Sequence, residues 1–158
     1  VAKYSNYDTM NLKEQIDTDI KKAMLSKDRD ALLALRSVKS LILIAETEKG
    51  SGGELSKDTE LKLLMKAVKQ RKESAEIYAS QDRKDLEEVE LAELEIIEKY
   101  LPAQLSDNQL TDKLKEIIKK IGASAPSDMG KVMGIATKEL AGQADGKVIA
   151  SLVKKLLA

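Results

Sequence analysis

The apolar residues of this 158-residue chain recur every three to four positions, which places them along one face of an α-helix. The pattern starts at Asn11 and predicts a first helix ending near Asp28, then a longer helix over residues 30–49. Residues 41–44 are all apolar and would also suit a strand, but the length of the surrounding periodicity favours helix. The glycine-rich residues 50–53 end this segment, because glycine adopts the left-handed conformations found at helix ends.

The next two helices differ in charge. Ser56 is a good N-cap for the third helix, and Asp58 and Glu60 suit the positive end of its dipole. Much of the rest of this helix is basic, whereas the fourth helix is acidic and ends at Leu101, since Pro102 disfavours helical geometry in the preceding residue. A basic helix followed by an acidic one across a short turn predicts an antiparallel hairpin with surface ion pairs.

Three shorter helices follow. A capping box at Ser106 opens a fifth helix that ends at Gly122. A sixth helix starts at Ser127 or Asp128, and Asp145 caps the last one, whose apolar positions keep regular helical spacing to the C-terminus.

These elements predict an all-α fold, with a four-helix N-terminal unit followed by a small three-helix C-terminal unit. We expect the N-terminal helical domain to cover residues 10–102 and the C-terminal three-helix domain to cover residues 103–158. Residues 1–9 are interpreted as a disordered extension or an expression remnant.

The composition removes several kinds of chemistry. The chain has no cysteine and no histidine, which excludes disulfides, thiol nucleophiles, Cys/His zinc sites and His-based triads. With four Tyr and no Phe or Trp, a bank of stacking rings for single-stranded nucleic acid is disfavoured. No apolar run is long enough to span a membrane and no secretion signal opens the chain, so we expect a cytoplasmic protein without membrane contact. We also expect no DNA partner, metal or cofactor.

The net charge of zero hides an asymmetry. The chain before Ala103 has 18 basic and 21 acidic residues, whereas the chain from Ala103 onward has 9 basic and 6 acidic residues. This excess of positive charge indicates a partner surface on the C-terminal half.

A cluster of glycines and lysines on that half is the first candidate site, and it has two interpretations. As a binding surface, it would let phosphates approach the backbone closely beside lysine ammonium groups. As a structural feature, which we favour from these residues alone, Gly130 and Gly134 allow tight helix packing and the later glycines form turns. The candidate contact residues are Gly130, Lys131, Gly134, Lys138, Gly142 and Lys147.

The second candidate is a set of charged residues around the third and fourth helices. Glu93 falls on the apolar stripe of its helix and needs a cationic partner, for which Arg36 and Arg71 are the candidates. Di-iron bundles use Glu-x-x-His pairs, so a metal role for Glu90 and Glu93 is disfavoured in a chain without histidine. We interpret the set as a structural polar cluster that fixes the hairpin, with a phosphate-facing patch as the alternative. Its members are Arg36, Arg71, Glu73, Tyr78, Arg83, Glu90 and Glu93.

The chain resembles the GatB/YqeY family over residues 10–158. The resemblance depends on the order and spacing of several segments together with Glu90 and Glu93. The segments are Leu35-Arg36, Arg71-x-Glu73-Ser74-Ala75-Glu76-x-Tyr78, Arg83-x-Asp85-Leu86, Tyr100-Leu101-Pro102-x-Gln104-Leu105, Asp128-Met129-Gly130-Lys131-Val132-Met133-Gly134 and Gly142-x-x-Asp145-Gly146-Lys147.

The resemblance implies a helical protein related to the C-terminal tail of the B subunit of the tRNA-dependent amidotransferase. In that family the tail grips the tRNA while the catalytic cradle lies elsewhere, and the cradle has no counterpart here. We therefore expect a non-catalytic tRNA-binding or amidotransferase-related accessory protein. One alternative is a protein–protein adaptor for an aminoacyl-tRNA synthetase or an amidotransferase subunit. Another, implied by the family label alone, is a carbon–nitrogen ligase with glutamine as amido donor.

Overall fold

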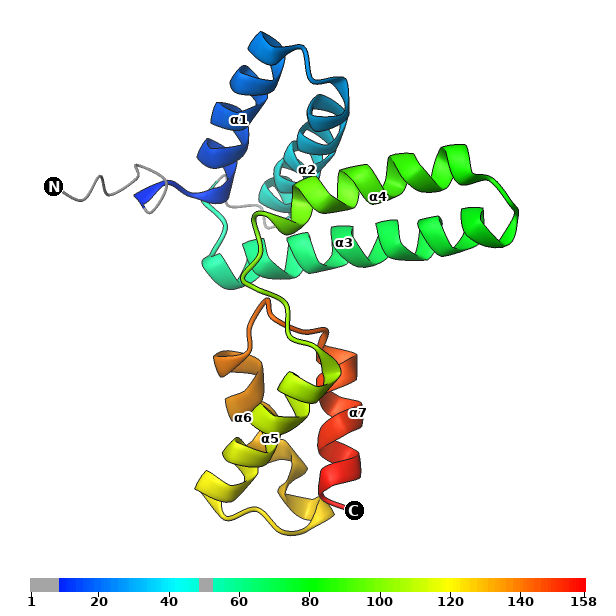
Figure 1. The fold of residues 1–158 in the computed structure, drawn as a ribbon. Helices are drawn as coiled ribbons and strands as arrows, with labels where there is room; N and C mark the ends of the chain where they lie inside the picture. The colour runs from blue at the N-terminus through cyan, green and yellow to red at the C-terminus, as the bar shows by residue number, and fades with distance from the viewer. Residues whose placement is uncertain (1–8, 49–52) are drawn as a thin grey trace, which may run out of the picture. The chain divides into compact units, whose positions relative to one another are not determined.

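The computed structural model describes residues 9–48 and 53–158, and these residues are all helix, turn or loop (Figure 1). The absence of strands in the described residues confirms the all-α prediction, and residues 41–44 lie inside a helix. All of the predicted extension over residues 1–9 except Thr9, and residues 50–52 of the glycine-rich segment, lie outside the described residues. The α-helices are α1 (Leu12–Ser26), α2 (Arg29–Glu48), α3 (Lys57–Ser80), α4 (Lys84–Glu98), α5 (Asp107–Ile121), α6 (Met129–Glu139) and α7 (Gly146–Leu156), with a 3-10 turn at Pro126–Asp128.

Polar side chains and left-handed residues define the helix ends. The Ser56 hydroxyl accepts a hydrogen bond from the Thr59 amide, and the predicted capping box at Ser106 is present. The Asp145 carboxylate accepts from the Lys147 amide at 2.8 Å. Gly122 ends α5 with φ +71°, a conformation that favours glycine. The predicted helix ends are therefore confirmed at these positions, where the signal is local.

The chain divides into two compact units, Val1–Tyr100 and Leu101–Ala158. In the first unit, α3 and α4 form a long antiparallel hairpin, and α1 and α2 form another (Figure 1). Its apolar core includes fully buried side chains from all four helices, namely Ile16, Val38, Ile42, Leu64 and Ile97. Packing of these stripes supplies most of the stability, because exposed ion pairs each contribute only about 0–1 kcal/mol.

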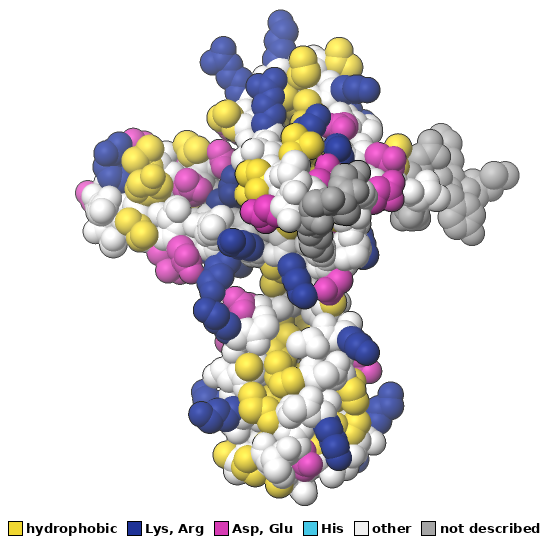
Figure 2. All heavy atoms as spheres, turned by 180° about the vertical axis from the view of Figure 1, so that it is seen from behind, with side chains coloured by type: hydrophobic (Ala, Val, Ile, Leu, Met, Phe, Trp, Pro, Cys, Tyr) yellow, Lys and Arg dark blue, Asp and Glu magenta, His cyan; other side chains and the backbone are white. Residues whose placement is uncertain are grey.

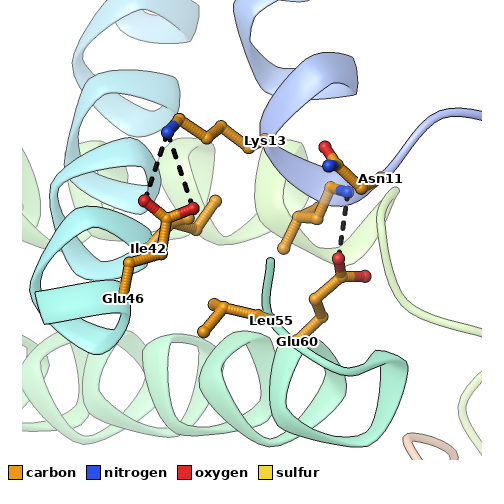
Figure 3. A pocket seen from close by; sticks show the side chains of 7 residues that line it. Asn11, Lys13, Ile42, Glu46, Leu55 and Glu60 are labelled. Carbon is orange, nitrogen blue, oxygen red and sulfur yellow. Dashed lines mark hydrogen bonds and ion pairs between the residues drawn. The ribbon is translucent and has the colours of Figure 1, made fainter. Parts of the chain in front are cut away.

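A buried carboxylate holds the start of α1 in this unit. Glu60 is only 6% exposed, and its Oε1 accepts a hydrogen bond of 3.2 Å from the Leu12 backbone amide (Figure 3). Nearby, Lys13 Nζ donates to Glu46 Oε2 at 3.1 Å. Glu60 stands in the first turn of α3, as expected, but it also satisfies an amide that has no partner within α1.

The second unit has its own core. Side chains from α5, α6 and α7 converge, and nine of them are buried. The backbone amide of Leu105 donates to the Gln143 carbonyl at 3.0 Å, and this bond ties the start of the unit to the connection between α6 and α7. The buried residues are Leu110, Leu114, Ile117, Val132, Ala136, Leu140, Ile149, Val153 and Leu157.

Candidate functional site

The glycine and lysine residues of α6 lie on its exposed side. Gly130, Lys131, Gly134 and Lys138 are all exposed, whereas Val132 and Ala136 of the same helix are fully buried. A Cβ atom placed on either glycine would have no heavy atom within 4 Å, apart from the adjacent residues and the backbone of α6 itself. The interpretation that these glycines allow tight helix packing is therefore wrong for the described structure, since the buried face of α6 is formed by other residues.

The spacing of these residues places the lysines on one side of the helix. Lys131 and Lys138 are seven residues apart, or about two turns, which separates their Cα atoms by about 10 Å along the axis. Gly134 lies between them, three residues from one and four from the other, so all three share a face. We call Gly130, Lys131, Gly134 and Lys138 the α6 glycine–lysine face. It combines two ammonium groups with helix backbone that no Cβ covers.

Gly142 and Lys147 lie beyond α6. Gly142 has φ +75°, and its carbonyl accepts a hydrogen bond of 2.6 Å from Gln104 Nε2, so its predicted role as a turn residue is confirmed. Lys147 is exposed at the start of α7, next to Gly146. Figure 2 shows basic side chains distributed over the visible face of this unit, with apolar side chains between them.

Asp128 fixes the loop that leads into α6. Its Oδ2 accepts hydrogen bonds from the backbone amides of Ser124 at 3.0 Å and Ala125 at 3.1 Å. These two bonds, with a smaller contribution from the positive charge of Lys131, lower the pKa of the Asp128 carboxyl. Asp128 therefore stays ionised at neutral pH and holds the loop one turn before Lys131.

The structure brings together only part of the predicted polar cluster. Arg71 Nε donates to Glu93 Oε2 at 3.0 Å, and Arg71 Nη2 donates to the Ser37 hydroxyl at 2.6 Å. The Arg71 and Glu93 side chains are only 14% and 16% exposed. One arginine therefore links α2, α3 and α4, and Arg71 is the partner that Glu93 requires.

No ion pair or side-chain hydrogen bond among the described residues joins the other members to this network. Arg36 is exposed on α2, because it stands one position after the buried Leu35 and is rotated by about 100° around the helix. Glu73 is exposed and Glu90 is half-buried. The expectation that all seven residues form one cluster is therefore wrong.

Arg83 forms a separate pair at the turn of the hairpin. Its guanidinium donates to both carboxylate oxygens of Asp85, at 3.1 and 3.0 Å, and its backbone amide donates to the Tyr78 carbonyl at 2.9 Å. The hydrogen bond from Arg83 lowers the pKa of the Asp85 carboxyl. This exposed pair lies at the start of α4, where Arg83 is the N-cap residue and Asp85 is in the first turn.

Two partners were not indicated by the sequence. Ser37 contacts Arg71 across 34 residues, and the Tyr100 hydroxyl donates to Asp19 Oδ2 across 81 residues. Neither pair has a local signature, since each depends on how helices distant in sequence pack. Glu93 did have a signature, because a carboxylate on an apolar stripe requires a partner.

Within residues 9–48 and 53–158, no three Asp or Glu side chains lie close enough to hold a metal ion, and none of the helices is long and apolar enough to cross a membrane. The geometry therefore offers a surface with cations and exposed backbone on α6, and a structural ion pair in the first unit.

Comparison with known families identifies the chain. The family model described as Yqey-like protein matches residues 13–157, nearly the whole sequence. The chain belongs to the YqeY-like family. The resemblance to GatB/YqeY proteins is thereby confirmed.

Three curated relatives of this YqeY-like protein are similar to most of its length. The relative from Clavispora lusitaniae is 34% identical over 150 residues, which cover 92% of this chain and 86% of that protein. The Meyerozyma guilliermondii relative is 36% identical and covers 74% of this chain and 62% of that protein. The Lachancea thermotolerans relative is 32% identical over 86% of this chain and 73% of that protein. All three are named "Altered inheritance of mitochondria protein 41, mitochondrial".

These names correct one expectation from the sequence. We expected a cytoplasmic protein from the sequence, but the relatives are named as mitochondrial proteins. The expected cytoplasmic location is therefore contradicted. It was inferred because neither a membrane span nor a secretion signal was recognised, and that observation does not separate cytoplasmic from mitochondrial proteins.

Proposed function

We propose that this YqeY-like protein is a non-catalytic accessory protein that contacts the sugar-phosphate backbone of tRNA through its C-terminal unit. The observation that supports the proposal is the α6 glycine–lysine face, where Gly134 lies exposed between Lys131 and Lys138. We also infer that a four-helix unit and a three-helix unit divide the work, with the RNA contact on the three-helix unit.

The chemistry of this face suits a phosphate backbone. A residue with a Cβ would hold a phosphate away from the helix, whereas Gly130 and Gly134 leave open space above the backbone. Lysine ammonium groups on either side attract phosphates as flexible point charges. Contacts of this kind recognise the shape of a folded RNA and not its base sequence.

The charge distribution supports the same assignment. The segment from Ala103 onward carries three more basic than acidic residues, whereas the segment before it has three more acidic than basic residues. An RNA backbone is therefore attracted by the C-terminal half and repelled by the N-terminal half. The choice of tRNA comes from the resemblance to the amidotransferase B-subunit tail, because the relatives' names mention mitochondrial inheritance and no RNA.

The experiment is fluorescence anisotropy of labelled bulk tRNA with the full chain across a salt series. The test variant is Lys131→Glu/Lys138→Glu/Lys147→Glu. The matched control is Lys113→Glu/Lys120→Glu/Lys154→Glu. It replaces three exposed lysines of the same unit and therefore changes the net charge by the same amount as the test variant.

We expect the parent to bind with micromolar affinity or tighter, and the affinity to fall as salt rises because counterions are released. The test variant should lose at least about tenfold in affinity, and the control clearly less. Equal losses in both variants would show that net charge acts without a defined site. No binding by the folded parent would refute the RNA proposal.

A further inference from the structure

The outer side of α2 carries an apolar and cationic stripe that the proposed RNA contact does not use. Leu33 is 56% exposed, Leu43 is 42% exposed and Ile44 is 50% exposed. The buried side of the same helix is formed by other residues, including Ala34, Leu35, Val38 and Ile42. We call the exposed set the α2 outer stripe, which consists of Arg29, Leu33, Arg36, Ser40, Leu43 and Ile44.

These six residues form one continuous face. Successive members are three or four positions apart as far as Leu43, and Ile44 follows directly. This spacing places the six residues within about 100° of arc around the helix, over a length of about 22 Å. Figure 2 shows hydrophobic and basic side chains next to each other over the unit that contains α1 and α2. Leu33 lies toward one end of this face, and Leu43 and Ile44 lie toward the other, with Arg36 and Ser40 between them. Three large apolar side chains exposed on one helix face, beside unpaired arginines, are the kind of surface that a partner covers.

The two arginines give this face a charge of one sign. Neither Arg29 nor Arg36 forms an ion pair or side-chain hydrogen bond with another described residue, and Asp30 is the only carboxylate between Arg29 and Ile44. Asp30 projects beside the stripe and not within it. Arg29 and Arg36 are seven residues apart, so their guanidinium groups start about two turns from each other on the same side.

We propose that the α2 outer stripe docks an amphipathic helix of a partner protein that carries two carboxylates about two turns apart and Leu or Ile side chains along the same face. The carboxylates would pair with Arg29 and Arg36, since a guanidinium binds a carboxylate with two parallel hydrogen bonds. The apolar side chains would cover Leu33, Leu43 and Ile44. This inference is independent of the RNA contact, which lies in the other unit.

The arrangement of the stripe favours a protein helix over two other partners. In helices that lie on membranes, cations flank the apolar face and stay near the headgroups. Here Arg29 lies between Leu33 and Leu43 in angle around the helix. Acyl chains that covered the two leucines would also surround the arginine charge, which is unfavourable. An RNA backbone would pair with the arginines but would leave Leu33, Leu43 and Ile44 uncovered.

The test uses the full chain and a fluorescein-labelled helical peptide of about 18 residues, long enough to match the stripe. The peptide carries two Glu seven positions apart and three Leu on one face, with Ala and Gln elsewhere. A second peptide replaces both Glu by Lys. The protein variants are Arg29→Glu/Arg36→Glu for charge and Leu33→Gln/Ile44→Gln for apolar contact. The control is Lys21→Glu/Lys66→Glu, two exposed lysines outside the stripe.

We expect saturable binding of the Glu peptide by anisotropy, weakened at least about tenfold by each stripe variant and little by the control. The Lys peptide should bind better to the Arg29→Glu/Arg36→Glu variant than to the parent. Three results would overturn the proposal: no saturable binding by the parent, equal weakening by the control, or a self-associated chain in sedimentation that dissociates in the stripe variants. Stronger binding of the stripe to anionic phosphatidylglycerol vesicles than to the Glu peptide would also overturn it.

Discussion

Gly130 and Gly134 occupy exposed positions inside α6, where glycine lowers helix stability. From the sequence alone, tight helix packing was the simpler explanation for glycine at these two positions. The open space beside both residues contradicts that explanation. A destabilising residue that no neighbour requires is expected where function uses the exposed backbone. The two exposed glycines therefore favour the interpretation of the α6 glycine–lysine face as a binding surface.

Replacing Gly134 by alanine tests this argument through stability. We expect Gly134→Ala to raise the free energy of unfolding of the C-terminal unit by about 0.5–1 kcal/mol, because alanine restricts the unfolded chain and its Cβ meets nothing within 4 Å. Urea denaturation followed by circular dichroism measures the change. The matched substitution Gly122→Ala should destabilise, since Gly122 has φ +71°. A destabilised Gly134→Ala variant would restore the packing interpretation.

Asp128 makes a second prediction at this scale, on pH. Its pKa is lowered in the folded state by the amides of Ser124 and Ala125, so its stabilising effect is present above the unfolded pKa and is lost as pH falls through the folded value. The Asp128→Asn variant should therefore be less stable than the parent at neutral pH, and the difference should shrink below about pH 4. Urea denaturation from acid to neutral pH measures it. Asp112→Asn on α5 serves as the control, and a difference independent of pH would contradict the assignment.

At the scale of elements, local signals predicted more than tertiary ones. The capping box at Ser106 and the left-handed end at Gly122 depend on residues within one turn, and the structure has both. The position of Glu93 on an apolar stripe predicted an arginine partner, and the candidates were Arg36 on α2 and Arg71 on α3. The choice of Arg71 depends on how the helices pack, which the sequence pattern does not give. The hydrogen bond between Glu60 and Leu12 joins residues 48 positions apart, and no sequence pattern predicts it.

The Arg71 network yields the prediction for the element scale. Glu93→Gln should lower the free energy of unfolding of the first unit by about 1–3 kcal/mol, because Arg71 then loses a charged partner in a mostly buried position. The double variant Arg71→Met/Glu93→Leu should recover much of the loss, since neither charge remains buried. Thermal and urea unfolding of Arg71→Met, Glu93→Leu and their double variant form a double-mutant cycle. Additive effects of the two positions would show that the pair contributes nothing.

At the scale of the whole molecule, charge and packing divide the chain near the same place. The acidic excess lies before Ala103 and the basic excess after it, while the compact units meet after Tyr100. Each unit also carries a different candidate surface: the α6 glycine–lysine face in the second unit and the α2 outer stripe in the first. A protein built this way could hold RNA with one unit and a protein helix with the other.

The second unit is expected to fold without the first. Nine buried residues from α5, α6 and α7 form its core, and the bond from Leu105 to Gln143 closes it within residues 101–158. Helical domains of about 60 residues can fold alone but are marginal in stability. A fragment of residues 101–158 should therefore show helical circular dichroism and cooperative unfolding, and its amide NMR spectrum should overlay many peaks of the full chain.

A core substitution serves as the control for this fragment. Leu114→Ala, at a fully buried position, should lower the free energy of unfolding by about 2–5 kcal/mol and unfold much of the fragment. A parent fragment without cooperative unfolding would show that this core needs the rest of the chain, and the proposed tRNA contact would then be tested only with the complete protein.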